Sequence, residues 1–339
     1  MAAGSAGEPV RTVFFGGGTP SLLEPSQLET VLSCLRSGFS LAPDAEISLE
    51  ANPGTVTREK LAAFRSLGIN RVSFGIQSFR DADLGFLGRI HDGRQALECL
   101  ALARAAGFGN VGLDLIYGIP GQTLPGWEEN LRRAVDLEPE HLSAYSLIVE
   151  EHTPLHRMVE AGRVQVTPTD LEAALYERAM ERFEAAGYEH YEVSNYARPG
   201  FRCRHNGAYW SHQAYLGFGP SAHSFRPAED GKHARRWWNV ADLVGYGARL
   251  TRGIVPVESE ERLGPAQLHR ERIFLGLRSG GLDLDRLARE AGDGWLAERQ
   301  AILRALTDEG LATREGPRLR LTRRGFVLCD EIGARLCRA

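Results

Sequence analysis

Residues that could bind a ligand follow the first apolar segment of this chain. Residues 10–15 are mostly β-branched or aromatic, and three glycines, Thr19 and Pro20 come directly after them. Glycine costs backbone entropy, so three in a row mark a place where something must come close to bare backbone. A ligand loop and a plain tight turn into a helix are both consistent with Gly16–Thr19 taken alone.

Polar residues recur at the ends of later apolar segments. Asp114 lies inside the apolar run 111–117, where a carboxylate is costly unless it has a partner. A functional or paired role is therefore expected for it. The other positions of this kind are Glu50 with Asn52, Gln77, and the stretch Ile148–Glu150. Their repetition after successive segments predicts one site built from several elements.

The segments that must position these residues alternate between strand and helix patterns. Runs rich in β-branched and aromatic residues predict strands at 10–15, 46–50, 71–76, 111–117, 141–148 and 189–193. Start and stop signals predict helices at about 24–37, 57–67, 81–87, 93–106, 125–137 and 169–186. Strands that alternate with helices in this way form a parallel sheet covered by the helices.

The distribution of polar residues distinguishes two α/β architectures. A doubly wound sheet concentrates its site at one switch point, whereas a (β/α) barrel builds its site from the carboxyl ends of several strands. Polar residues recur on the successive strands here, which favours a barrel or partial barrel. We therefore predict an α/β fold, with a disordered lead at 1–9 and a (β/α) barrel or partial barrel over 10–193.

The rest of the chain divides into two parts. Residues 194–258 are rich in glycine, aromatic residues, histidine and arginine, and predict a connector that covers the site or a packed irregular linker. Residues 259–339 predict a small winged-helix-like domain with a hairpin around Glu315–Pro317. Its predicted helices are at about 265–277, 283–291, 295–309 and 323–338. Arginines near the hairpin give this domain local positive charge, which would suit DNA binding. Because the chain as a whole is acidic, a structural or partner-docking role for the domain is favoured.

Composition argues against several classes of protein. The chain has 339 residues, a net charge of -4 and a pI near 6.2, which argues against a nucleic-acid surface as its main feature. No apolar run approaches the length of a membrane span, and residues 1–7 do not have the pattern of a secretory signal. Five widely spaced cysteines do not make a disulfide framework, so a cytoplasmic protein is expected.

Several motifs, taken together, resemble one family. They are Phe15-Gly-Gly-Gly-Thr-Pro20, Glu46-Ile-Ser-Leu-Glu50, Gly68-Ile-Asn-Arg-Val-Ser73, Gly75-Ile-Gln-Ser-Phe79, Asp114-Leu-Ile-Tyr-Gly-Ile-Pro120 and Tyr191-Glu-Val-Ser-Asn-Tyr-Ala-Arg198. Their order and spacing resemble the coproporphyrinogen dehydrogenase-like branch of the radical SAM superfamily, which cleaves S-adenosylmethionine (SAM) at a [4Fe-4S] cluster. Within that branch, His205-Asn-Gly-Ala-Tyr-Trp210 and the segment 215–224 are similar to the HemW-type haem chaperones.

The resemblance implies SAM, a [4Fe-4S] cluster and haem as cofactors or ligands, with an unidentified protein as haem acceptor. The family holds its cluster through Cys-x3-Cys-x2-Cys after the first barrel strand, and three thiolates leave one iron open to SAM. None of the five cysteines has that spacing, and the corresponding strand and loop would precede Val10. We therefore predict a barrel without its first strand, and no metal-ligating or catalytic residue is assigned. A fragment, a wrongly placed start and a degenerate relative are all consistent with this sequence.

Matched motif positions imply where SAM would bind. Gly17, Gly18 and Thr19 correspond to the loop that meets the methionine end of SAM, where bare backbone allows close approach. Glu50 corresponds to a position that contacts the ribose, and a surface acid before a turn is its alternative interpretation. Gln77 supplies an amide that can both donate and accept hydrogen bonds.

Four further positions complete the implied SAM set. Arg89 could pair in a bidentate way with the SAM carboxylate, and a solvated helix charge is the alternative. Asp114 belongs to the set as a buried acid. Ile148 would act through backbone or packing, and His223 corresponds to a position near SAM. Because some relatives bind a second SAM, the molecule that each residue would contact is left open.

His205 is the candidate haem ligand, because neutral imidazole is a common axial ligand of haem iron. Tyr209, Trp210, Tyr215 and Phe218 could wall the flat macrocycle. A histidine that is only hydrogen-bonded within the structure is the simpler interpretation.

The favoured function is a SAM-binding haem chaperone of the HemW type, without its cluster in this form. An oxygen-independent coproporphyrinogen III oxidase, an enzyme of porphyrin biosynthesis, is the first alternative. A cofactor-free interaction protein is the second. The aromatic segment after His205 favours the chaperone over the oxidase, and neither nucleic acid nor a membrane is an expected partner.

Overall fold

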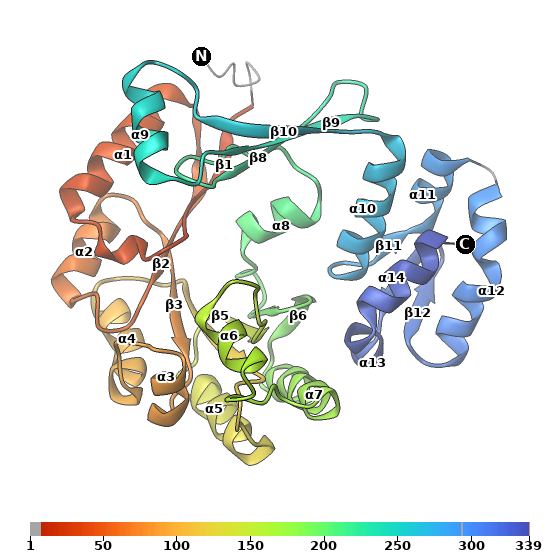
Figure 1. Ribbon diagram of the computed structural model, residues 1–339, viewed down its shortest axis with the longest axis horizontal. Coiled ribbons are helices and arrows are strands. Elements are labelled where there is room, and N and C mark those ends of the chain that lie inside the picture. The colour runs from red at the N-terminus through yellow and green to blue at the C-terminus, as the bar shows by residue number, and fades with distance from the viewer. Residues whose placement is uncertain (1–7, 293, 339) are drawn as a thin grey trace. The chain divides into compact units, whose positions relative to one another are not determined.

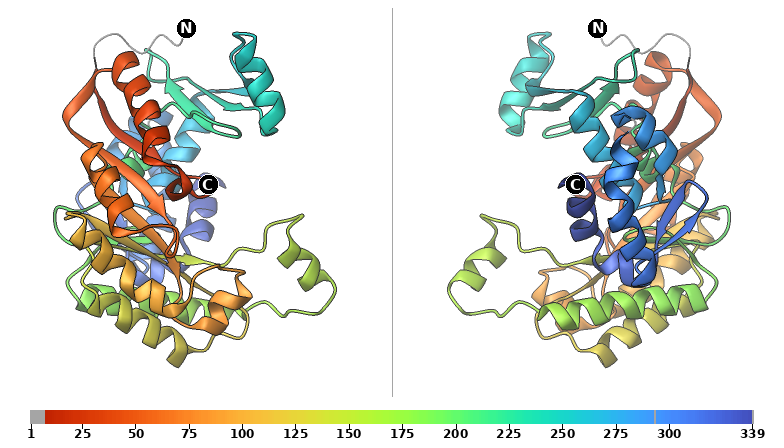
Figure 2. Two further views of the ribbon diagram at one scale, coloured as in Figure 1. Left: turned by 90° about the vertical axis from the view of Figure 1, so that its left-hand side faces the viewer. Right: turned by 90° about the vertical axis from the view of Figure 1, so that its right-hand side faces the viewer.

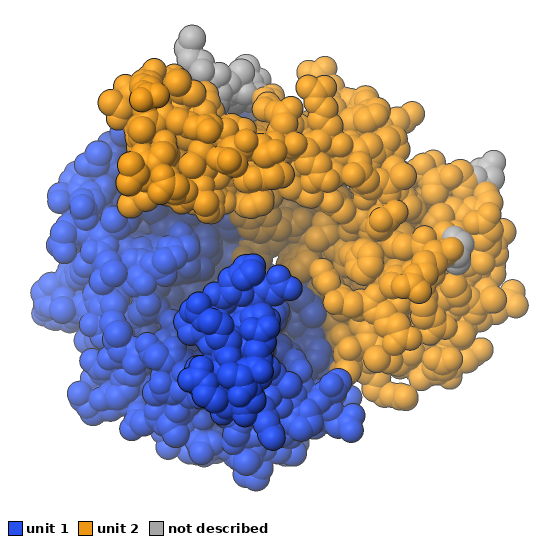
Figure 3. All heavy atoms as spheres, in the orientation of Figure 1, with its two compact units in different colours: residues 1–205 blue, residues 206–339 orange. Residues whose placement is uncertain are grey.

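The computed structural model describes residues 8–292 and 294–338. The chain divides into two compact units, residues 1–205 and 206–339, and the division falls inside helix α8 (Arg204–Trp210) (Figure 3). Unit 1 holds a seven-stranded sheet and unit 2 holds two three-stranded sheets. The disordered lead predicted at 1–9 lies outside the described residues except for Glu8 and Pro9.

Unit 1 is built on a curled, open sheet in the strand order β1-β2-β3-β4-β5-β7-β6 (Figure 1). Strands β1 to β5 are parallel, whereas β7 is antiparallel to both β5 and β6. The bounds are β1 Val10–Phe15, β2 Leu41–Ala51, β3 Arg71–Gln77, β4 Val111–Tyr117, β5 His141–Ser146, β6 Glu189–Glu192 and β7 Asn195–Ala197. The predicted α/β class, a partial barrel, is confirmed by this half-barrel.

Helices connect the parallel strands and lie on the outside of the curl (Figure 1). Several begin where a side chain caps the first turn: Thr57 accepts from Lys60 N and Asp92 accepts from Gln95 N. Their bounds are α1 Pro25–Gly38, α2 Arg58–Ser66, α3 Asp81–Phe86, α4 Gly93–Ala105, α5 Leu124–Asp136, α6 Pro154–Glu160 and α7 Thr169–Ala185, with a short 3-10 turn at Pro20–Leu22. Helix α6 buries no residue and projects from unit 1 (Figure 2).

The core of unit 1 lies between the sheet and these outer helices. Phe64 of α2, Trp127 of α5 and Phe183 of α7 are buried together with strand residues such as Leu113. The Trp127 indole also donates to the carbonyl oxygen of Leu175 at 2.8 Å, which joins α5 to α7. Because the helices bury one face of the sheet, the strands hold a fixed register, and their carboxyl ends meet at one edge.

Unit 2 begins with an antiparallel sheet in the order β10-β9-β8. Its elements are β8 His223–Pro227, β9 Ala234–Asn239, α9 Leu243–Thr251 and β10 Val257–Leu263. The region 194–258, in which the sequence showed little periodicity, therefore contains β7, α8, β8, β9, α9 and the start of β10. These strands are short and their buried positions do not alternate regularly, which is why no strand pattern was visible.

The remainder of unit 2 has the predicted winged-helix-like order of helices and a hairpin. It contains α10 Pro265–Leu277, β11 Leu282–Asp283, α11 Leu284–Ala291, α12 Gly294–Asp308, the hairpin β12 Ala312–Glu315 and β13 Arg318–Leu321, α13 Arg323–Val327 and α14 Cys329–Arg338. The single last helix that the sequence predicted is thus two helices. Leu303, Leu306 and Ile332 belong to a separate hydrophobic core. Over the described residues, no helix has both the length and the apolar character that crossing a bilayer requires.

Candidate functional site

The glycine loop after β1 lies beside the end of β2. Gly17 N donates to Glu50 Oε2 at 3.2 Å, which fixes the carboxylate against the loop backbone. Gly17 and Gly18 have φ values of 78° and 60°, and no other atom lies within 4 Å of where a Cβ would stand. The loop is therefore exposed, left-handed backbone that glycine adopts at no steric cost. This geometry suits a ligand that binds main-chain atoms.

The ends of the first three strands are joined by short polar side chains. Asn52 Nδ2 donates to Thr19 Oγ1 at 3.2 Å, which connects the loop after β1 to the end of β2. A Cβ on Gly75 would stand 2.8 Å from Gln77 Nε2 and 3.1 Å from Asn52 Oδ1. Gly75 is thus the position at which the side chain of Gln77 turns back toward β2. Thr19, Glu50 and Gln77 are brought together as the sequence predicts.

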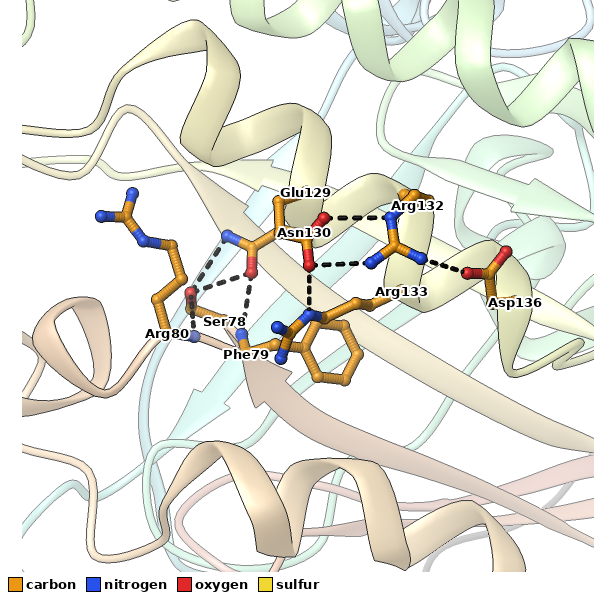
Figure 4. Close-up of polar contacts among 8 residues, drawn as sticks. All are labelled: Ser78, Phe79, Arg80, Glu129, Asn130, Arg132, Arg133 and Asp136. Atoms are coloured by element: carbon orange, nitrogen blue, oxygen red, sulfur yellow. Dashed lines mark hydrogen bonds and ion pairs between the residues drawn. The ribbon is translucent and has the colours of Figure 1, made fainter.

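The backbone at Gln77 is held in an unusual conformation. Gln77 has a φ of 67°, in the left-handed region that non-glycine residues adopt only when their surroundings impose it. The next residues supply that constraint, because Asn130 of α5 accepts from Phe79 N at 2.9 Å and donates to Ser78 Oγ at 3.0 Å (Figure 4). Ser78 Oγ in turn donates to Asp83 Oδ2 at 2.7 Å. This buried network positions the end of β3.

Asp114 lies on β4 between two serine hydroxyls. Ser143 Oγ of β5 donates to Asp114 Oδ1 at 2.6 Å, and Ser73 Oγ of β3 donates at 3.1 Å. Burial raises the pKa of the Asp114 carboxyl, whereas Ser143, Arg71 and Ser73 oppose the rise. These contacts give Asp114 the partners that a buried carboxylate requires, and its role in a ligand site stays a prediction.

Glu50 and Asp114 influence each other. Burial raises the pKa of Glu50, and the charge of Asp114 raises it further. The hydrogen bond from Gly17 and the charge of Arg71 act in the opposite direction. Two carboxyl groups that share one polar edge in this way favour a ligand rich in hydrogen-bond donors.

Arg71 is the residue that the sequence did not single out. It starts β3 and is only 2% exposed, and it lies within electrostatic reach of Glu46, Asp114 and Cys203. Gly112 leaves it room, since a Cβ there would stand 3.3 Å from Arg71 Nη2. The sequence signal that could have identified Arg71 is a charged residue at the start of an otherwise apolar strand. A buried cation at such a position requires acidic partners.

Arg89 lies in the loop after α3, near the same strand end. Its Nε is buried without a hydrogen-bond partner among the described residues, and burial lowers the pKa of its guanidinium. His91 follows it, and its Nε2 donates to the carbonyl oxygen of Ile76 at 3.0 Å. A guanidinium whose Nε has no hydrogen-bond partner among the described residues is suited to binding a carboxylate ligand.

His205 is anchored to the first two strands. Its Nδ1 is 3.0 Å from Thr12 Oγ1, and its ring stacks on Phe14 at 4.7 Å between centroids. Its backbone N–H and the thiol of Cys203 both donate to Glu46 Oε1, at 3.1 and 3.5 Å. Burial lowers the pKa of the imidazole, so the neutral form is favoured.

Two further predicted positions have no hydrogen bond or ring contact with the residues of this strand-end cluster, within the described part of the chain. Ile148 follows β5 and is 69% exposed, so most of its side chain is open to solvent. His223 belongs to unit 2, where it begins β8 and stacks on Trp238 at 5.6 Å. Among residues 8–292 and 294–338, no group of His, Cys, Asp or Glu has the arrangement needed to hold a metal ion.

Comparison with known proteins agrees with this architecture. The Radical SAM superfamily matches residues 1–134, and the HemN C-terminal domain matches residues 263–328. The structure of coproporphyrinogen III oxidase (HemN) from Escherichia coli has a TM-score of 0.78 and 22% identity, covering 97% of this chain and 78% of that one. This likeness shows the fold.

Sequence similarity to curated proteins is higher. The heme chaperone HemW of Mycobacterium tuberculosis is 41% identical over 324 residues, which is 95% of this chain and 80% of that protein. The heme chaperone HemW of Bacillus subtilis is 35% identical over 329 residues, which is 96% of this chain and 85% of that protein. On this similarity, the chain belongs to the HemW family of the radical SAM superfamily.

Proposed function

We propose that this protein is a haem chaperone, which binds haem and transfers it to an acceptor protein. The observation that carries the proposal is the 41% identity to a heme chaperone HemW over 95% of the chain. The likeness to coproporphyrinogen III oxidase is at 22% identity and supports the shared fold alone. A cytoplasmic location stays a prediction from the use of cysteine.

We also propose that the strand-end cluster binds SAM. The exposed backbone of Gly17 and Gly18 would meet the methionine end, with Thr19 closing the loop. Glu50 would accept from the ribose hydroxyls, because its half-buried carboxylate already faces the loop. Bound SAM supplies a sulfonium group whose reductive cleavage is the chemistry of the superfamily.

Three more side chains would complete the SAM site. Gln77 is held at the end of β3 in a left-handed backbone conformation, and its amide would supply a donor and an acceptor. Arg89 would bind the SAM carboxylate through its partly desolvated guanidinium, whose Nε has no hydrogen-bond partner among the described residues. Asp114 would act indirectly, because its charge raises the pKa of Glu50 and so favours the protonated form of that carboxyl. These residues therefore fit the cofactor.

The described residues do not fit a [4Fe-4S] cluster. Cys99, Cys203 and Cys329 are buried at separate places, and no set of metal-ligand side chains is gathered. We assign no step to cluster chemistry and no catalytic residue. Haem binding is proposed instead to use His205, whose ring orientation is set by Thr12 and Phe14.

Haem titration tests the proposed function. Purified protein should give a saturable Soret band, and His205→Ala should shift or weaken it. His233→Ala is the control, because that side chain is 58% exposed and pairs only with Asp230 among the described residues. Transfer of bound haem to an apo-haem protein should follow. Binding without transfer, or consumption of coproporphyrinogen III by the purified protein, would contradict the proposal.

A further inference from the structure

Unit 2 contains a cavity of about 320 Å³ that none of the predicted SAM positions lines. It is an open cavity lined by the end of α8 and the segment that follows it, by strands β8 and β9, and by helix α10. Its lining is mostly apolar, with four aromatic rings and Leu275. The rings are those of Tyr209, Tyr215, Phe225 and Phe274. A concave, largely apolar site with a few polar groups is the usual form of a small-molecule site.

The aromatic rings present flat surfaces to one another. Tyr209 meets Tyr215 edge-on, with 4.6 Å between centroids, and Tyr215 stacks on Phe225 at 6.2 Å. Tyr209 remains 41% exposed although it has these neighbours. Large apolar rings left partly open to solvent indicate that another flat, apolar group can be covered there.

The charged lining is predominantly basic. Arg236, Arg270 and Arg278 line the cavity, and Glu271 is its single acidic lining residue. Arg236 donates to both oxygens of Glu271, at 2.9 and 2.7 Å, and Arg278 pairs with Asp330 at 2.6 Å. Arg236 and Arg278 are therefore each paired with an acidic group, so the positive charge available to an anionic ligand is that of Arg270.

Arg270 differs from the other two arginines. Its side chain is exposed, and within the described ranges it forms no ion pair. A guanidinium at the rim of an apolar cavity can bind a carboxylate through two parallel hydrogen bonds. It is consequently the residue best placed to recognise an acidic group on a ligand whose body is apolar.

The base of the cavity is held by a polar network. His212 Nε2 lies 2.9 Å from Glu271 Oε2, and the His212 ring stacks on Phe225 at 5.3 Å. His212 has a φ of 54°, and its buried Nδ1 has no hydrogen-bond partner among the described residues. Strained backbone and an unpartnered ring nitrogen are features that structures retain at ligand sites.

We propose that this cavity binds the edge of a tetrapyrrole, with the aromatic rings against the macrocycle and Arg270 on a propionate carboxylate. The inference rests on the proposed function and deepens it, because it adds a place for the cargo that does not depend on iron ligation by His205. A tetrapyrrole is larger than the cavity, so one edge is held and the rest projects.

Metal-free protoporphyrin IX is the probe, because it binds without iron ligation. Its fluorescence is titrated against the full chain, alone and with the variants Arg270→Glu and Leu275→Trp. The first reverses the rim charge and the second fills the cavity. Arg262→Glu is the matched control, since Arg262 lies on β10 with an 87% exposed side chain outside the lining. Protoporphyrin IX dimethyl ester, which has no carboxylate, tests the role of Arg270.

Arg270→Glu should raise the Kd for protoporphyrin IX by about tenfold, the loss expected for a charge-assisted contact. Leu275→Trp should raise the Kd because the indole occupies the space proposed for the edge of the macrocycle. Arg262→Glu should leave the Kd unchanged, and Arg270→Glu should scarcely affect the dimethyl ester. Equal Kd values for wild type and Arg270→Glu would overturn the inference, even if Leu275→Trp failed to fold. If haem binding and transfer then remained intact, the proposed function would stand without this cavity. If the variants bound protoporphyrin IX more weakly but the wild type transferred no haem, the proposal for the cavity would be supported and the proposed chaperone function would be contradicted.

Discussion

At the scale of single residues, the strand-end site depends on one buried cation. Arg71 is 2% exposed, and its charge lowers the pKa of Glu50 and of Asp114 against the rise that burial causes. Glu46 lies within its electrostatic reach as well. Removal of one partner from a buried charge group leaves the others uncompensated.

We predict that Arg71→Met lowers the free energy of unfolding by about 3–5 kcal/mol at pH 8, because the remaining carboxylates stay buried without their cation. The deficit should shrink at pH 5, where carboxyls with raised pKa values take up protons more readily in the folded state. Urea unfolding at both pH values measures it. Arg94→Met, at an exposed helix pair with Glu98, is the control and should change little. A deficit that is the same at both pH values would contradict this explanation.

Glu192 gives a second prediction for a single residue. It is 1% exposed at the end of β6, and burial raises its pKa from 4.5 to about 7. Between these values the unfolded chain has released the proton while the folded chain retains it, so stability falls as pH rises from about 4.5 to 7. The shift corresponds to a loss of about 3 kcal/mol at pH 8.

Glu192→Gln should therefore be more stable than wild type at pH 8, with a gap that narrows steadily toward pH 5. Denaturant midpoints across this range provide the measurement. Glu189→Gln, on the same strand but 42% exposed, should show no such growing gap. A gap independent of pH would mean that the substitution acts through packing and not through the proton.

At the scale of elements, α5 fixes the end of β3. Asn130 is fully buried and satisfies Phe79 N and Ser78 Oγ, the two groups that follow the left-handed Gln77. We predict that Asn130→Ala destabilises the protein by about 2–3 kcal/mol, since it leaves a buried donor unpaired. It should also weaken SAM binding, measured by calorimetry, because Gln77 loses its support.

Arg132→Ala is the matched control for that variant. Arg132 lies on the same helix and pairs with Glu129 and Asp136 at the exposed surface (Figure 4). It should leave both stability and SAM affinity unchanged. Unaltered SAM affinity in Asn130→Ala would show that the network is purely structural.

Regular elements were predictable where the pattern was local. Strand β4 and helix α10 have the predicted bounds, because apolar periodicity and turn signals coincide there. Strand β2 begins at Leu41, several residues before the predicted start, because Leu41 pairs with Val10 across the sheet. The short strand β7 was not predicted, since three residues carry no periodic signal and its pairing with β5 is set by distant sequence.

The candidate site was predictable to a similar extent. Glu50, Gln77 and Asp114 could be named because each interrupts or ends an apolar strand. The partners Ser73 and Ser143 could not, because a serine in a strand is unremarkable until register sets Asp114 opposite Ser143. Arg89 could be assigned a role only by resemblance, and its unpartnered Nε became visible in the structure.

At the scale of the whole molecule, the described residues of each unit form hydrophobic clusters of their own. Leu113 of β4 is buried in unit 1, whereas Leu306 of α12 belongs to the core of the last helices in unit 2. Two units that each have their own core can unfold independently when they share few buried contacts. A Leu→Ala substitution in the core of either unit should lower the free energy of unfolding of that unit by about 2–5 kcal/mol.

We therefore predict that the two substitutions have separable effects on hydrogen–deuterium exchange. Leu306→Ala should speed exchange across α10 to α14 and leave β3 and β4 protected, so that SAM binding by the strand-end cluster is retained. Leu113→Ala should speed exchange in the seven-stranded sheet and spare the hairpin β12–β13. Peptide-resolved exchange followed by mass spectrometry measures both. If either variant accelerated exchange equally throughout the described chain, the molecule would be one cooperative unit, and the cavity in unit 2 would depend on the half-barrel for its stability.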